Sequence, residues 1–107
     1  MVTIRWNKKA RTLFREHIKY ARSEFGEETA SRWYRQINTI EDRLRKHPES
    51  YPQESLIIKG HIYRSAIIMG RFKIVHFYIP SSNTVRIVDI WDMRMNPENL
   101  KRRISTL

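Results

Sequence analysis

The chain has 107 residues, which is long enough for one domain with its own hydrophobic core. It contains no cysteine, and this excludes disulfide bonds and thiolate metal sites. Its 21 lysines and arginines against 11 aspartates and glutamates give a net charge of +10, which favours a polyanionic partner such as nucleic acid, a ribosome or an acidic protein over a merely solvated basic surface.

The first residues predict a strand followed by a helix. Val2, Ile4 and Trp6 alternate with polar residues, as in a short strand with one buried face. Asn7 is a suitable helix N-cap, and Gly26 marks the end of the helix. Between them the residues on the core side recur every three or four positions, the spacing of an amphipathic helix: Ala10, Leu13, Phe14, His17, Ile18, Ala21 and Phe25.

A second amphipathic helix is predicted directly after Gly26, and Pro48 ends it. Its apolar stripe consists of Ala30, Trp33, Tyr34, Ile37, Ile40 and Leu44. Because a single glycine-centred turn joins the two helices, they must be antiparallel neighbours. Three aromatic residues of these helices are interpreted as core, with a base-stacking platform as the alternative: Phe14, Trp33 and Tyr34.

Residues 62–94 carry the strongest strand signal. They are rich in Ile, Val, Phe, Tyr and Trp and are interrupted only at residues 69–71 and 80–83. This pattern predicts a meander of three strands joined by tight turns, with a short strand before it at residues 56–58.

A last helix is predicted after the meander. Asn96 and Pro97 provide its cap and first residue, and it ends near Ile104. The fold class is therefore α+β in a single domain, residues 1–107. We expect an antiparallel β-sheet, made of the N-terminal strand and a C-terminal meander of three to four strands, packed against an α-helical hairpin and followed by a short C-terminal helix.

The two turns of the meander suggest which side chains share a face of the sheet. If Met69 pairs with Phe72 and Ile79 with Thr84, one face collects three cations, Arg64, Lys73 and Arg86. Both faces carry large apolar side chains, and the last helix is too short to cover one of them alone. We therefore expect a partner chain to cover part of the sheet.

The chain lacks the motifs of nucleotide-binding proteins, metalloproteases and serine hydrolases. Its four histidines lie in four different elements without the spacing of metal ligands: His17, His47, His61 and His76. No metal or other cofactor is expected. The remaining residues suit cleavage of RNA by its own 2'-hydroxyl, a reaction that needs a base, an acid and cations but no cofactor.

The predicted catalytic set combines three cations with one histidine. The cations would stabilise charge growing on the phosphate, and the histidine, which ordinarily titrates near neutrality, would move a proton. The set consists of Arg64, Lys73, Arg94 and His61. Further basic residues are predicted to bind nucleic acid, namely Lys59, Arg71, Arg86, Lys101 and Arg102.

Some of these side chains have plainer interpretations. His76 is a second candidate for proton transfer, but it lies among apolar residues and is interpreted as a core histidine. For His61, at a strand edge, the alternative is an exposed side chain without a role. For Arg94 the alternative is an ion pair with Asp92 or Asp89.

Several short segments, in this order and spacing, resemble the RelE/ParE superfamily over nearly the whole chain. They are Trp6-Asn7 before the first helix, residues 44–48 at the end of the second, residues 70–75, and residues 87–94 with Asn96-Pro97 behind them. The resemblance implies a toxin of a bacterial type II toxin-antitoxin module that is silenced by a tightly bound antitoxin. An antitoxin segment wrapped around the domain would cover the exposed face of the sheet.

The resemblance implies two different targets. RelE-like members enter the ribosomal A site and cut mRNA, and Arg64, Lys73 and Arg94 match their basic positions. ParE-like members instead poison DNA gyrase and lack a nuclease constellation. The chain departs from the nuclease pattern at Ala66 and Leu100, and its helices are long, as in the ParE group.

The first hypothesis is therefore a growth-inhibiting toxin that acts as a metal-independent, ribosome-dependent mRNA endonuclease. The alternatives are a ParE-like gyrase inhibitor without catalysis, and an inactive basic domain that binds only its antitoxin or RNA. No segment has the 18 or so apolar residues of a membrane span, so we expect a cytoplasmic protein.

Overall fold

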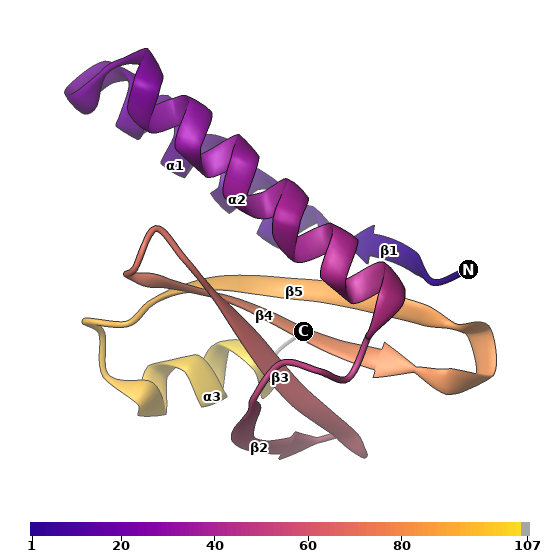
Figure 1. Ribbon diagram of the computed structural model, residues 1–107. Helices are drawn as coiled ribbons and strands as arrows, with labels where there is room; N and C mark the ends of the chain where they lie inside the picture. The colour runs from indigo at the N-terminus through magenta and orange to yellow at the C-terminus, as the bar shows by residue number, and fades with distance from the viewer. Residues whose placement is uncertain (106–107) are drawn as a thin grey trace.

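The computed structural model describes residues 1–105, apart from the side chains of residues 56–58. Its elements follow the predicted order, and the α+β fold class is confirmed (Figure 1). They are β1 (Thr3–Trp6), α1 (Lys8–Phe25), α2 (Glu27–Lys46), β2 (Gln53–Ile58), β3 (His61–Ile68), β4 (Phe72–Ile79), the 3₁₀ turn η1 (Pro80–Ser82), β5 (Thr84–Asp92) and α3 (Pro97–Ser105). No helix in this part of the chain is both long and apolar enough to cross a membrane.

Asn7 starts α1 and ties it to the sheet. Its side-chain oxygen accepts a hydrogen bond from the Ala10 backbone N–H at 2.8 Å, which confirms the predicted N-cap. Its side-chain amide donates to the Val88 carbonyl of β5 at 3.1 Å. At the other end of α1, Gly26 adopts a φ of 92° and is the only residue between α1 and α2. The two helices therefore form the predicted hairpin.

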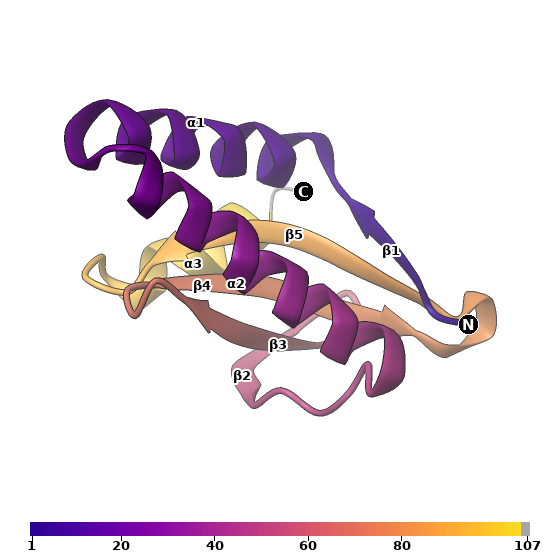
Figure 2. The same cartoon turned by 45° about the horizontal axis from the view of Figure 1, so that its top comes forward.

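The five strands form one sheet in the order β1-β5-β4-β3-β2. Strands β2 to β5 are antiparallel to their neighbours, as a meander requires. Strand β1, however, pairs in parallel with β5, with Ile4 opposite Val85 (Figure 2). The sheet is mixed, so the prediction of a purely antiparallel sheet is wrong at this edge. The helical hairpin carries the chain from β1 to the opposite edge, and the meander returns to β1 with β5 running in the same direction.

The turn between β3 and β4 shifts the predicted register by one residue. Met69 and Gly70 have positive φ angles of 55° and 65° and form the centre of the turn. As a result Ile68, and not Met69, pairs with Phe72. A residue other than glycine in the left-handed region is uncommon, so the sequence favoured a turn centred on Gly70 and Arg71 instead.

This register decides which cations share a face. Arg64 lies in the row of β3 that faces the helical hairpin, whereas Lys73 and Arg86 lie on the side that carries α3. The predicted gathering of all three on one face is therefore wrong for Arg64. The pairing of Ile79 with Thr84 at the second turn is confirmed.

The larger core lies between the helical hairpin and the sheet (Figure 1). Trp33 and Leu44 of α2 meet Ile74 of β4 there, and none of the three is more than 4% exposed. Phe14 packs at the margin of this core, but Tyr34 is 47% exposed. The interpretation of the helix aromatics as core thus holds for Trp33 and Phe14 and fails for Tyr34, whose ring meets that of Phe14 edge to face but remains half exposed.

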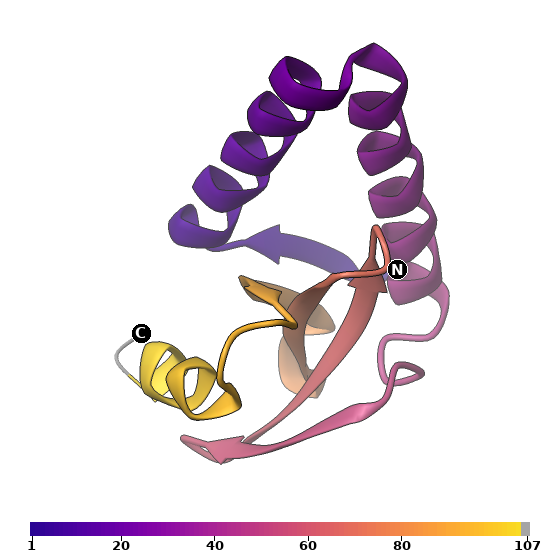
Figure 3. The same cartoon turned by 90° about the vertical axis from the view of Figure 1, so that its left-hand side faces the viewer.

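A smaller core lies on the opposite face, under α3 (Figure 3). Leu100 and Ile104 of α3 pack there on apolar residues of the three central strands: Tyr63, Val75, Phe77, Val88 and Trp91. On the same face, Ile67 is 57% exposed. This agrees with the expectation that the short last helix leaves part of the sheet uncovered.

Candidate functional site: an arginine-lined cleft

A cleft of about 560 Å³ opens between the joined ends of α1 and α2, the β3–β4 turn and the segment after β5. It is lined by His17, Tyr20, Ala21, Phe25, Thr29, Trp33, Met69, Arg71, Phe72 and Arg94. We call it the arginine cleft, because two arginines form its sheet side.

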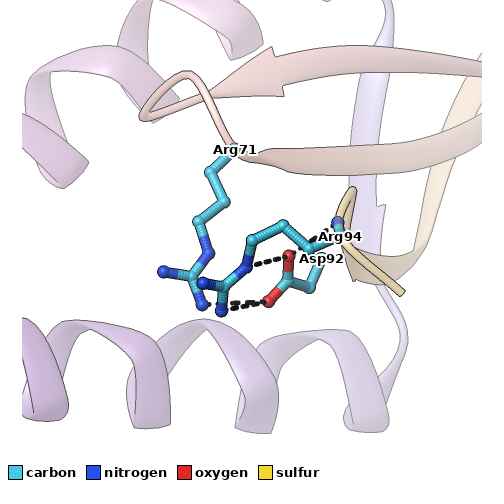
Figure 4. Close-up of polar contacts among 3 residues, drawn as sticks. All are labelled: Arg71, Asp92 and Arg94. Carbon is cyan, nitrogen blue, oxygen red and sulfur yellow. Dashed lines mark hydrogen bonds and ion pairs between the residues drawn. The ribbon is translucent and has the colours of Figure 1, made fainter.

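The two arginines share one carboxylate (Figure 4). Arg71 and Arg94 each donate from Nη2 to Asp92 Oδ2, at 3.0 and 3.2 Å. The Nε and the backbone N–H of Arg94 also donate to Asp92 Oδ1, at 3.3 and 3.0 Å. The Asp92 side chain is only 17% exposed, while those of Arg71 and Arg94 are 44% and 67% exposed. The ion pair of Arg94 with Asp92, considered as an alternative from the sequence, is confirmed.

The floor of the cleft is aromatic and holds a histidine. The His17 imidazole stacks on Trp33 with ring centroids 5.5 Å apart, and Phe72 lies 4.5 Å from His17. Burial lowers the pKa of His17 from its ordinary 6.5, and the charge of Arg71 acts in the same direction, although Asp92 opposes both. His17 is therefore neutral at pH 7, and the positive charge of the cleft comes from the arginines.

The helix side of the cleft is apolar and open to solvent. Tyr20 and Phe25 meet edge to face with ring centroids 6.2 Å apart, and they are 61% and 66% exposed. Exposed aromatic side chains beside arginines are typical of protein-binding surfaces. The cleft can thus hold an anion against its arginines and an apolar group against its rings. Among the described residues, no three carboxylate or imidazole groups are placed to hold a metal ion.

Comparison with known proteins decides the family. The family model described as the ParE toxin of the type II toxin-antitoxin system parDE matches residues 4–97, a range that includes the helical hairpin, the meander and both arginines of the cleft. The chain belongs to the ParE toxin family. It is therefore a toxin of a toxin-antitoxin system with a cognate antitoxin as its partner, and the resemblance to the RelE/ParE superfamily is confirmed.

Solved structures share the fold of this ParE-family toxin. A chain from a structure of the chromosomal ParDE TA system from P. aeruginosa matches with a TM-score of 0.65, over 86% of this chain and 96% of that chain. The two sequences are 15% identical, so this match shows a common fold. A search of curated proteins finds no match.

Two residues of the predicted catalytic set have partners elsewhere in the ParE fold. Arg64 Nη1 donates to the Tyr51 carbonyl at 2.9 Å, and its Nη2 lies 3.7 Å from the Glu49 carboxylate. Lys73 Nζ lies 2.5 Å from Glu54 Oε1, on the other face of the sheet. Each of these cations therefore connects two segments of its own face, and the structure does not bring them together.

The histidines of the meander also contact other groups of the fold. The His61 ring stacks on Phe77 with centroids 4.0 Å apart. His76 is fully buried, and its Nδ1 lies 2.9 Å from the Ile74 carbonyl, which confirms its interpretation as a core histidine. Burial lowers the pKa of His76 to about 4. Of the four predicted catalytic residues only Arg94 lines the arginine cleft, and their catalytic role stays a prediction.

The residues predicted to bind nucleic acid are distributed over several elements. Arg71 lines the arginine cleft. Lys59 lies in the turn before β3, Arg86 on β5, and Lys101 and Arg102 are exposed on α3. Binding of nucleic acid by these residues stays a prediction.

The position of His17 in the cleft and the link between Arg71 and Asp92 were not predicted from the sequence. His17 is the one titratable residue in the core-side stripe of α1, and this was the available signal. Arg71 and Asp92 are 21 residues apart, and they meet because Phe72 pairs with Asp92 across β4 and β5. That pairing depends on the register of the sheet, which the sequence did not provide.

Proposed function

We propose that this ParE-family toxin stops growth by binding DNA gyrase and that it catalyses no reaction of its own. The competing hypothesis, mRNA cleavage, requires cations and a proton-transfer group around one phosphate. The observation that carries the proposal is the separation of the residues predicted for that task. Arg64 faces the helical hairpin, Lys73 faces the side of α3, and Arg94 lies in the arginine cleft.

The contacts of these residues give further support. The Arg64 side chain is only 14% exposed and donates to the Tyr51 carbonyl, so it would have to leave this partly buried acceptor unpaired before it reached a phosphate. Lys73 would have to leave Glu54, whose carboxylate also accepts a hydrogen bond from Ser65 at 2.7 Å. A nuclease site built from these cations would need a rearrangement of both faces of the sheet.

A toxin that acts by binding needs firmly held, exposed side chains and has no need of an acid and a base. The arginine cleft offers such a surface, with two arginines on the sheet side and Tyr20 and Phe25 on the helix side. The net charge of +10 favours association with an acidic partner or with an enzyme that is bound to DNA. Since gyrase acts on chromosomal DNA, the proposal places the toxin in the cytoplasm.

The face that carries α3 offers a surface for the antitoxin. Ile67 and Met93, which are 57% and 42% exposed, line a hollow of about 430 Å³ there. An antitoxin segment laid over this hollow would bury both side chains and supply the cover that α3 does not provide.

The test separates the possible targets. Purified toxin is added to gyrase with relaxed plasmid DNA and, separately, to a cell-free translation reaction with a defined mRNA. We expect loss of supercoiling or accumulation of cleaved plasmid, intact mRNA, and reversal of the effect by the antitoxin. Cleavage of the mRNA at codons with normal supercoiling would overturn the proposal in favour of the endonuclease. Absence of both effects would instead favour the inactive basic domain.

A further inference from the structure

We propose that the arginine cleft binds an acidic peptide segment of a partner protein, in which a carboxylate side chain stands next to an aromatic or aliphatic one. The carboxylate would lie against Arg71 and Arg94, and the apolar side chain against Tyr20 and Phe25. This inference rests on the proposed function in one respect, because a toxin that acts by binding needs a recognition site for a protein.

The sheet side of the cleft has more N–H donors than the chain itself uses. A guanidinium group carries five N–H donors. Within the described part of the chain, Arg71 engages Asp92 through Nη2 alone and Arg94 through Nε and Nη2. The remaining donors lie on side chains that are 44% and 67% exposed, above a carboxylate that is largely covered. Two cations with one anion leave a net positive charge, and a second carboxylate would balance it.

The two guanidinium groups are held close together by the chain itself. Arg71 comes from the β3–β4 turn and Arg94 from the segment after β5, and both reach the same Asp92 oxygen (Figure 4). The Met93 backbone N–H donates to the Arg71 carbonyl at 2.9 Å, which joins these two segments. The arginines are therefore positioned before a ligand arrives, and this lowers the entropic cost of binding.

The helix side of the cleft offers an apolar surface next to the arginines. Tyr20 and Phe25 are the two most exposed aromatic side chains among the described residues, and both line the cleft. A volume of about 560 Å³ is in the range of sites that take a few side chains of a ligand. Burial of an apolar side chain between these rings would add to the attraction of the arginines for a neighbouring carboxylate.

These observations favour a peptide over nucleic acid. Trp33 and Phe72, on the floor, are only 4% and 8% exposed and offer no open face for a base. Tyr20 and Phe25 are inclined at 76° to each other and cannot both stack on consecutive bases. Moreover, a nucleic-acid strand is held through many phosphate contacts, whereas this cleft has a single surplus charge.

The test is a titration of isotope-labelled, full-length toxin with the peptide acetyl-Gly-Ser-Phe-Asp-Leu-Ser-Gly-amide, followed by nuclear magnetic resonance. We expect millimolar peptide to shift the Nε–Hε signals of Arg71 and Arg94 and the methyl signal of Met69. The same peptide with Asn in place of Asp should bind about tenfold more weakly. The protein variants Arg71→Gln and Arg94→Gln should each lose a similar factor, while Arg45→Gln, at the other end of α2 and 42% exposed, should bind as the wild type does.

Three results would overturn the inference: no response of the cleft signals, equal binding of the Asn peptide, or tighter binding of a single-stranded RNA hexanucleotide at the same signals. Backbone spectra establish that each variant is folded. Phe25→Ser, on the helix side of the cleft, is an independent variant that should also weaken peptide binding. Because the titration contains no gyrase, the two proposals fail separately. Gyrase inhibition without peptide binding would contradict only the proposal that the cleft binds an acidic peptide. Peptide binding without gyrase inhibition would contradict only the proposal that gyrase is the target.

Discussion

Two regions of this toxin are built from the same kinds of side chain and differ in how their arginines are paired within the chain. In the first, which we call the Tyr51 cluster, the guanidinium of Arg43 lies 4.0 Å over the Tyr51 ring, Arg64 holds the Tyr51 carbonyl, and the buried His76 meets the Tyr51 ring at 5.7 Å. The second is the arginine cleft, which also combines two arginines with aromatic rings and a histidine.

The difference lies in how the donors of the arginines are satisfied. Arg43 donates to the side chain and the carbonyl of Ser50, and Arg64 donates to a carbonyl and pairs with a carboxylate. In the cleft, Arg71 and Arg94 share one carboxylate and remain exposed. Arginines and aromatic rings therefore stabilise the fold where the chain supplies separate acceptors for each guanidinium group. They form a binding surface where two guanidinium groups share one acceptor. Residue type alone does not distinguish these roles.

The largest effect is expected from His76 in the Tyr51 cluster. Its pKa is lowered to about 4 by burial, against 6.5 for an ordinary histidine, so the unfolded chain takes up the proton more readily than the folded one. The stabilising contribution of neutral His76 is complete above pH 6.5 and is lost as the pH falls to about 4. We expect this residue to lower the free energy of unfolding by about 3 kcal/mol over that range.

Urea unfolding at pH 7 and at pH 4 measures this contribution in the wild type and in His76→Gln. The variant should lose less stability on acidification than the wild type does. His47→Gln, at an exposed position, is the matched control and should keep the wild-type pH dependence. An unchanged pH dependence in His76→Gln would show that folding does not lower the pKa of this imidazole.

The next largest effect on stability is expected from Arg64. Arg64→Gln should lower the free energy of unfolding by about 1–2 kcal/mol, because the Tyr51 carbonyl loses its donor and Glu49 loses its partner. The corresponding change in the cleft, Arg94→Gln, should cost less than about 0.5 kcal/mol, since that side chain is 67% exposed. Chemical denaturation at pH 7 checks both values, and equal losses would contradict the distinction between the two regions.

A double variant in the arginine cleft tests the same comparison on gyrase inhibition. Arg71→Gln with Arg94→Gln should weaken gyrase inhibition by about tenfold, because two exposed cations are removed from the proposed binding surface. Lys101→Gln with Arg102→Gln removes the same charge from α3 and should leave inhibition within about twofold. Inhibition is measured as the toxin concentration that halves supercoiling. A similar loss in both double variants would indicate that only net charge matters.

The smallest effect is expected when the shared carboxylate is neutralised. Asp92→Asn keeps an oxygen that can accept from the Arg94 N–H but removes the anion that competes with a ligand. The acidic peptide should then bind about threefold more tightly, while stability changes by less than about 1 kcal/mol. The peptide titration measures the gain, and weaker binding would show that Asp92 is needed to position the arginines.

Much of the fold could be predicted because its signals are local. The N-cap at Asn7, the break at Gly26 and the apolar stripes of α1 and α2 depend on neighbouring residues. The alternation of β3 to β5 and the proline at the start of α3 are equally local. The parallel pairing of β1 with β5 was missed, because it joins residues about eighty positions apart and leaves no pattern in either strand.

The candidate site was predicted only in part. Arg94 was predicted to be catalytic and Arg71 to bind nucleic acid, and no common partner was predicted for the two. Their meeting at Asp92 requires the register between β4 and β5, and their place beside His17 requires α1 to lie over that end of the sheet. Neither condition is encoded in the spacing of these residues.

The amino-acid sequence by itself determined the order and type of the elements, the basic charge and the membership of the superfamily, because these depend on composition, periodicity and short motifs. Only the tertiary structure decided which arginines are satisfied inside the fold and which remain exposed. The physical reason is that a one-residue change in a turn moves every side chain of a strand to the other face of the sheet. The positive φ of Met69 thus separates Arg64 from Lys73.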